Sequence, residues 1–233
     1  MNKTSSDTEK TSAMTQGLLA VWPICLGYIP IGLAFGVLAQ KAGLGPLEIG
    51  LMSVFVFAGS SQFIAVSMVS AGAATASIIV TTFIVNLRHL LMSSSLSIFL
   101  KKVRREKLSL FAYGVTDESF AVNLSRFRHG DWNINAALVV NHAANLVWIA
   151  STVMGGYSGQ FIPEGAFGID YALIAMFICL LIYQLRARKY VIIAIIAGVL
   201  SVIFSLIIPG NSYIVLASVL AATIGVVFKK QIK

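Results

Sequence analysis

Long apolar stretches separated by short polar connections occupy nearly the whole chain. A stretch of about 20 apolar residues suits a helix that crosses a bilayer, and lipid offers the backbone no hydrogen-bond partners outside the chain. The pattern predicts an all-α fold, a polytopic transmembrane helical bundle of seven or eight apolar segments, some broken or re-entrant. Residues 15–233 would form a single transmembrane domain, preceded by a polar flexible tail over residues 1–14. The apolar segments run approximately over residues 17–40, 47–70, 75–100, 108–124, 134–154, 171–185, 190–208 and 213–228.

Composition and charge support a membrane protein and exclude two other classes. Charged residues make up 11% of the chain, whereas a soluble domain carries about a quarter. Strands of an outer-membrane barrel alternate in polarity and run to about ten residues. The apolar stretches of this chain are longer and do not alternate, which excludes a barrel. The net charge of +8 indicates cytoplasmic loops rather than a nucleic-acid partner, because Lys and Arg in short connections mark the cytoplasmic side. The basic clusters lie at residues 101–107, 126–128, 186–189 and 229–233.

The first segment carries residues that disturb a helix. Pro23 and Pro30 lie inside it, and two prolines in one span predict a kinked helix with freed carbonyl groups. Gly32 and Gly36 form a small-xxx-small face that favours close contact with another helix.

Two further segments are interrupted by small or polar residues. Residues 58–63 interrupt the second segment, which predicts either a helix break or an unbroken helix whose polar groups bond a neighbour. The basic clusters 101–107 and 126–128 both favour the cytoplasm, although only the fourth segment separates them. Either this segment, residues 108–127, is broken or re-entrant, which we favour, or Arg126 and Arg128 lie outside. Interrupted segments with polar residues are typical of a transporter's binding site.

The central feature of the third segment is a set of polar residues, Asn86, Arg88 and His89. An arginine in hydrocarbon needs a partner or a polar cavity, and the best candidates are Asp117 and Glu118 in the next segment. Two adjacent carboxylates on a helix cannot both face one partner, so one pairs with Arg88 and the other is free to titrate. The group is interpreted as a substrate or proton site, or else as a structural ion pair that docks two helices.

Other polar residues complete the candidate set. Ser60, Ser61, Gln62 and Asn145 join Asn86, Arg88, Asp117 and Glu118 as predicted substrate-binding residues, and Asp117, Glu118 and His89 are the predicted proton relay. His89 points about 100° away from Arg88 around a helix, so a neutral imidazole bonded across helices is the alternative to a relay. The sequence contains no spacing typical of a metal site, a nucleophile elbow or a phosphate-binding loop, so we expect no metal, no cofactor and no enzymatic activity.

Four motifs together resemble the AzlC-type large subunit of branched-chain amino acid exporters. They occur in the family's order, and the resemblance covers most of the chain from about Gly17 to Leu185. Ser60 stands where alanine is expected. The motifs are Gly27-Tyr-Ile-Pro-Ile-Gly-Leu-Ala-Phe-Gly36, Phe57-Ala-Gly-Ser-Ser-Gln-Phe63, Asn86-Leu-Arg-His89 and Thr116-Asp-Glu118.

The resemblance implies export of branched-chain amino acids, with methionine as a further candidate, across the bacterial inner membrane. It also implies a small, separately encoded membrane partner of the AzlD type. A hydrophobic amino acid is a zwitterion, so Arg88 suits its carboxylate and Asp117 or Glu118 its ammonium group; proton coupling is the hypothesis for its driving force. The rival interpretations are a membrane-embedded enzyme and an accessory or structural membrane subunit whose buried charges dock a partner.

Overall fold

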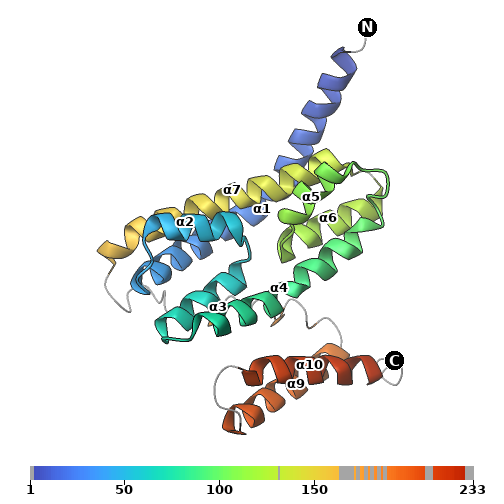
Figure 1. Ribbon diagram of the computed structural model, residues 1–233. Coiled ribbons are helices and arrows are strands. Elements are labelled where there is room, and N and C mark those ends of the chain that lie inside the picture. The colour runs from blue at the N-terminus through green and yellow to red at the C-terminus, as the bar shows by residue number, and fades with distance from the viewer. Residues whose placement is uncertain are drawn as a thin grey trace. The chain divides into compact units, whose positions relative to one another are not determined.

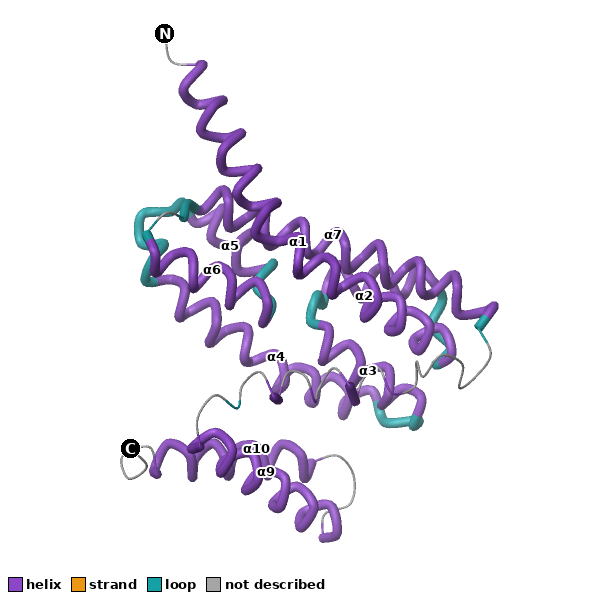
Figure 2. The backbone as a smooth tube through the Cα atoms, turned by 180° about the vertical axis from the view of Figure 1, so that it is seen from behind, coloured by secondary structure: helices purple, strands orange, loops and turns teal. Residues whose placement is uncertain are grey.

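The computed structural model describes residues 3–130, 132–162, 188–207 and 212–228, with isolated positions between 171 and 185. Most of these residues are helical, and they include no strand, which confirms the all-α prediction. The predicted segment 171–185 and the basic cluster 229–233 lie largely or wholly outside the described residues. Figures 1 and 2 show the helices α1 (Lys3–Lys41), α2 (Pro46–Phe55), α3 (Gly59–Ser70), α4 (Thr75–Ser97), α5 (Arg105–Tyr113), α6 (Asp117–His129), α7 (Ile134–Ser158), α9 (Arg188–Ile207) and α10 (Ser212–Phe228), with a short 3-10 turn η1 (Gly159–Phe161).

Contacts divide the chain into two compact units. The first contains residues 1–72 and 85–172, and the second residues 73–84 and 173–233. In the described part of the chain, four stretches are long and apolar enough to cross a membrane: Ala13–Lys41, Thr75–Ser97, Ile134–Phe161 and Tyr190–Ile207. Helix α1 already begins at Lys3, so residues 3–14 are helical where an irregular tail was expected; the mobility of this extension stays a prediction. Every candidate site residue belongs to the first unit.

The first unit is built on the side-by-side packing of α1 and α7 (Figure 1). A Cβ atom placed on Gly36 would lie 2.1 Å from the carbonyl oxygen of Thr152 and 2.5 Å from the nitrogen of Gly156. One placed on Gly155 would lie 2.2 Å from the carbonyl oxygen of Leu33. The two backbones are therefore in direct contact. This confirms the predicted close contact of the face formed by Gly32 and Gly36 with another helix.

Helices α2 and α3 form a hairpin. The hairpin starts beside the C-terminal ends of α1 and α7. A Cβ on Gly156, near the end of α7, would lie 3.6 Å from the Cα of Pro46, the first residue of α2. The helix breaks after Phe55, and Phe57 in the break has φ 38°, a region that bulky residues rarely adopt. Helix α3 then turns back, as both Figure 1 and Figure 2 show. The predicted break is confirmed, and the unbroken alternative is wrong.

Helices α5 and α6 form a second hairpin, which enters from the opposite end. Lys107 in the first turn of α5 donates to Oδ1 of Asn135 in the first turn of α7 at 2.9 Å. After a break over residues 114–116, α6 returns, and Phe127 near its end stacks on Phe99 with ring centroids 5.5 Å apart. The start of α5 and the end of α6 therefore lie at the same end of the unit, which confirms the predicted break and return of this segment. It also places the basic clusters 101–107 and 126–128 at that same end.

The order of elements in the first half of the chain repeats. A broken hairpin followed by a long helix occurs twice, as α2–α3 with α4 and as α5–α6 with α7. Corresponding helices start 58 or 59 positions apart, at Pro46 and Arg105, Gly59 and Asp117, and Thr75 and Ile134. The two hairpin tips meet part-way along α7, where the hydroxyl of Tyr113 donates to the carbonyl of Val54. The polar candidates lie around this meeting point.

Candidate functional site

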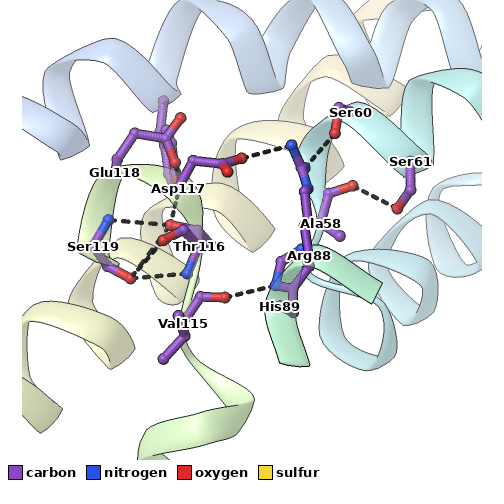
Figure 3. A network of polar contacts seen from close by, with 11 residues as sticks. Ala58, Ser60, Ser61, Arg88, His89, Val115, Thr116, Asp117, Glu118 and Ser119 are labelled. Carbon is purple, nitrogen blue, oxygen red and sulfur yellow. Dashed lines mark hydrogen bonds and ion pairs between the residues drawn. The ribbon is translucent and has the colours of Figure 1, made fainter. Parts of the chain in front are cut away.

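Arg88 joins the tips of the two hairpins (Figure 3). Its Nη1 lies 2.8 Å from Oδ2 of Asp117, the first residue of α6. Its Nη2 donates to Oγ of Ser60, the second residue of α3. The side chains of Arg88 and Asp117 are 31% and 32% exposed. The predicted pairing of Arg88 with one acid is present, and the same guanidinium also holds the other hairpin.

Glu118 faces a different partner. Its Oε2 lies 2.7 Å from the hydroxyl of Tyr28, a buried residue of α1. The same hydroxyl lies 2.9 Å from Oγ1 of Thr116, the residue that caps the start of α6. The structure thus separates the two adjacent acids, with Asp117 on Arg88 and Glu118 on Tyr28.

Tyr28 was not among the predicted site residues. The sequence offered one signal for it, because it lies in the Gly27–Gly36 motif, two positions before Pro30 in an apolar span. Its ring also contacts Trp148 of α7 edge to face, with centroids 5.2 Å apart. Tyr28 therefore connects α1, α7 and the tip of the α5–α6 hairpin.

His89 points at the backbone of the second hairpin. Its Nδ1 lies 2.7 Å from the carbonyl oxygen of Val115, so the proton sits on Nδ1 and is donated to that oxygen. Its Nε2 has no hydrogen-bond partner among the described residues, and the same holds for Oδ1 of Asn86. The contact matches the interhelical interpretation of His89, while its role as a relay stays a prediction.

Gln62 is fully buried and braces the break before α3. Its Oε1 accepts from the backbone nitrogen of Ala58 at 3.2 Å and from Nε1 of Trp148 at 3.0 Å, while its Nε2 donates to Oγ of Ser53 at 3.2 Å. Nearby, Ser61 donates to the carbonyl of Ala58 at 3.0 Å. Both residues support the hairpin tip, and their contact with a substrate stays a prediction.

Replacing Gln62 with leucine is expected to loosen the α2–α3 tip. The change removes three contacts at a buried site, and hydrogen bonds between membrane helices average about 0.6 kcal/mol each, so a loss of about 1–2 kcal/mol is expected. Thermal unfolding of the purified protein in detergent, followed by tryptophan fluorescence, measures this effect. Ser158→Ala in the last turn of α7 is the control, because its exposed hydroxyl bonds only its own helix, at the carbonyl of Met154. Equal melting temperatures for both variants would contradict the bracing role.

Two asparagines of α7 lie on the face that looks toward the hairpin tips. Asn141 donates to the carbonyl of Phe111 at 2.9 Å, and its Oδ1 accepts from Asn123 at 2.9 Å. Asn145, one turn later, is 6% exposed, and its Nδ2 has no partner among the described residues. Asn141 therefore anchors the second hairpin, whereas Asn145 retains a buried donor at the level of the tips.

The arrangement suits recognition of a small charged solute. It brings together one guanidinium, two carboxylates, a tyrosine hydroxyl and the start of α3, whose N-cap residue Ala58 provides no side-chain cap. No group of three His, Cys, Asp or Glu side chains within the described residues could hold a metal ion. The geometry therefore favours binding through charge and hydrogen bonds.

Comparisons with known proteins converge on one family. A family model described as AzlC protein matches residues 23–162. "Inner membrane protein YgaZ" of Escherichia coli K12 is 32% identical over 154 residues, which cover 65% of this chain and 63% of that protein, so the alignment spans less than two thirds of that relative. "Branched-chain amino acid transport protein AzlC" of Bacillus subtilis 168 is 27% identical over 215 residues, covering 91% and 83%. An "Uncharacterized membrane protein" of Archaeoglobus fulgidus is 30% identical over 200 residues, covering 84% and 87%. No solved structure matches the chain significantly.

Proposed function

Since the chain belongs to the AzlC family, a family of membrane proteins linked to branched-chain amino acid transport, we propose that it is a secondary transporter for branched-chain or other hydrophobic amino acids. The proposal includes its finer parts: export from the cytoplasm, a location in the bacterial inner membrane, coupling to protons, and work with a small membrane subunit of the AzlD type. The relatives named for an inner membrane and for branched-chain amino acid transport support it.

One observation carries the proposal: a single arginine lies where two broken helices meet. Interrupted helices whose ends lie inside the protein are the usual construction of a transporter's binding site, because helix starts attract anionic groups and freed carbonyls attract cations. Arg88 contacts the first turn of α3 through Ser60 and the first turn of α6 through Asp117. A structural pair alone would not require the arginine to contact both tips.

The chemistry of an aliphatic amino acid matches this group. In the proposed complex its carboxylate binds the guanidinium of Arg88 and the backbone N–H groups at the start of α3, which both favour anions. Its ammonium group binds the carboxylate of Asp117, the first residue of α6. The buried Nδ2 of Asn145 offers one further donor to a carboxylate oxygen. Asn86 precedes Arg88 by two positions on α4, and we propose it as a further contact of the amino acid.

Competition by leucine analogues tests the proposal. The purified protein is reconstituted in proteoliposomes, with and without the small AzlD-type protein, and counterflow of labelled leucine is measured. Isoleucine, valine and methionine are expected to compete. Leucinamide lacks the carboxylate and N-acetylleucine lacks the ammonium group, so each is expected to compete at least about tenfold less well, since a charged hydrogen bond contributes about 1.5–3 kcal/mol.

The outcomes separate transport from an accessory role. Absence of leucine counterflow in both preparations, with the protein correctly inserted, would contradict a transport function. Counterflow that leucinamide inhibits as well as leucine does would leave transport standing but would remove the carboxylate site at Arg88.

A further inference from the structure

The charges around the hairpin tips do not balance. Arg88 pairs with Asp117 at 2.8 Å, and each neutralises the other. Glu118 has no cationic partner within the described residues, where the two ion pairs are Arg88 with Asp117 and Arg104 with Glu106. Its contact is the neutral hydroxyl of Tyr28. A carboxylate in a membrane protein is costly to keep ionised without a cation.

We propose that Glu118, positioned by Tyr28, is the carboxylate that binds the coupling proton, and that Asp117 serves as the partner of Arg88. This assignment rests on the proposed transport function. When Glu118 takes up one proton, the carboxylate becomes a neutral carboxylic acid and the charges around the tips balance. When it releases that proton, the site regains one negative charge. A zwitterion carries no net charge, so one bound proton gives transport a net charge of +1 and a driving force.

The hydrogen bonds around Tyr28 can serve both forms of Glu118. A hydroxyl carries one hydrogen and two acceptor sites, and its hydrogen rotates to suit its neighbours. With Glu118 ionised, the Tyr28 hydroxyl donates its single hydrogen to Oε2 at 2.7 Å, and its oxygen stays 2.9 Å from Oγ1 of Thr116. With Glu118 protonated, the carboxyl donates to Tyr28, which then donates to Thr116. Thr116 in turn has an alternative acceptor in Oγ of Ser119 at 3.4 Å.

The chain of hydroxyl groups ends on the backbone. Ser119 lies 3.2 Å from the carbonyl oxygen of Gly114, to which its Oγ donates. Glu118, Tyr28, Thr116 and Ser119 therefore form a continuous path, in which the hydrogen of Tyr28 can turn from Glu118 to Thr116 without any heavy atom moving. Asp117 has no comparable path, because its carboxylate lies against a permanently charged guanidinium.

Other ionisable groups near the tips have different contacts. From α4, Arg88 and His89 face Asp117 and the carbonyl of Val115. From α7, His142 stacks on the ring of Tyr113, with centroids 6.4 Å apart. From α1, Tyr28 is the group that faces Glu118. Of the acids at the tips, Glu118 thus has the contacts expected of a residue that exchanges a proton.

Two transport modes measured on the same vesicles test the assignment. Counterflow exchanges leucine for labelled leucine and needs no net proton movement, whereas leucine movement driven by an imposed pH gradient does. Glu118→Gln is expected to reduce pH-driven movement to the level of empty vesicles while reducing counterflow far less. Asp117→Asn, the matched control one residue away, is expected to impair both modes, because it leaves Arg88 without its partner.

Tyr28→Phe tests positioning separately. The variant keeps the ring that packs on Trp148 and loses the hydroxyl. The pH at which driven movement is half-maximal should change, because the hydroxyl that contacts Glu118 in either of its forms is gone. A purely structural role for Tyr28 would change stability without moving this pH.

Each other result overturns the assignment. Loss of both modes in Glu118→Gln, with a raised KM for leucine, would show that Glu118 binds the ammonium group of the cargo. Retention of both modes would show that Glu118 takes no part in coupling. Absence of both modes in the wild-type protein would instead reject the transport function, so the two failures are distinguishable.

Discussion

Replacing Arg88 with alanine is expected to raise the KM for leucine counterflow about tenfold to hundredfold. Arg88 is the cation proposed to bind the cargo's carboxylate, and a charged hydrogen bond is worth about 1.5–3 kcal/mol. The change also removes the contact between the two hairpin tips, at Ser60 and Asp117. Counterflow of labelled leucine over a range of leucine concentrations measures this effect, after equal incorporation of the variant into vesicles is confirmed.

The chain provides a matched control for this change. Arg104 pairs with Glu106 at 2.9 Å, but those side chains are 78% and 75% exposed, and exposed ion pairs contribute little. Arg104→Ala is therefore expected to leave KM unchanged. Arg88→Lys should give an intermediate result, because an ammonium group is a point charge and cannot span both partners as the planar guanidinium does. An unchanged KM in Arg88→Ala would exclude Arg88 from the binding site.

Replacing Gly36 with alanine is expected to separate α1 from α7 and to destabilise the whole first unit. The new Cβ would lie within 2.7 Å of three backbone atoms, in Thr152, Gly155 and Gly156. Backbone atoms inside a helix cannot move aside as the end of a side chain can, so the cost should reach or exceed the upper end of the ~1–3 kcal/mol typical of overpacking. Thermal unfolding in detergent and the fraction of monodisperse protein measure the effect.

Gly27, earlier in the same helix, is the control. A Cβ there meets nothing within 4 Å, so Gly27→Ala should be neutral or stabilising by up to about 1 kcal/mol, because alanine favours helix over glycine. Similar melting temperatures for the two variants would mean that α1 and α7 do not depend on close backbone contact.

The sequence predicted the helices and favoured a return in residues 108–127, and it left a break in residues 47–70 as one of two alternatives. Apolar length indicates a span, and basic residues on both sides of residues 108–124 favoured a segment that returns to its starting side. The ion pair of Arg88 was also predictable, since a guanidinium in a span must find an acid. These conclusions depend on the cost of exposing polar groups to lipid, and the polar groups concerned can be identified from the sequence alone.

The position along α7 at which the two hairpins end was not predictable from the sequence. Three contacts of the site depend on that position. The choice of Asp117 over Glu118 as the partner of Arg88 depends on how α6 is rotated about its axis. The contact of Tyr28 with Glu118 joins residues 90 positions apart. Gln62, expected to contact substrate, uses both ends of its amide on protein groups instead. Periodicity fixes which residues share a helix face, but it carries no information on which distant residues that face meets.

The bond from Arg88 to Ser60 and the bond from Arg88 to Asp117 restrain different hairpins. Breaking the first removes the hold of Arg88 on the α2–α3 pair, and breaking the second removes its hold on the α5–α6 pair, while the bond from Tyr113 to Val54 still joins the two hairpins. The arms concerned are short, between 9 and 13 residues. A cargo whose carboxylate takes one of these two places on the guanidinium would therefore loosen one hairpin while the other stays bound to Arg88.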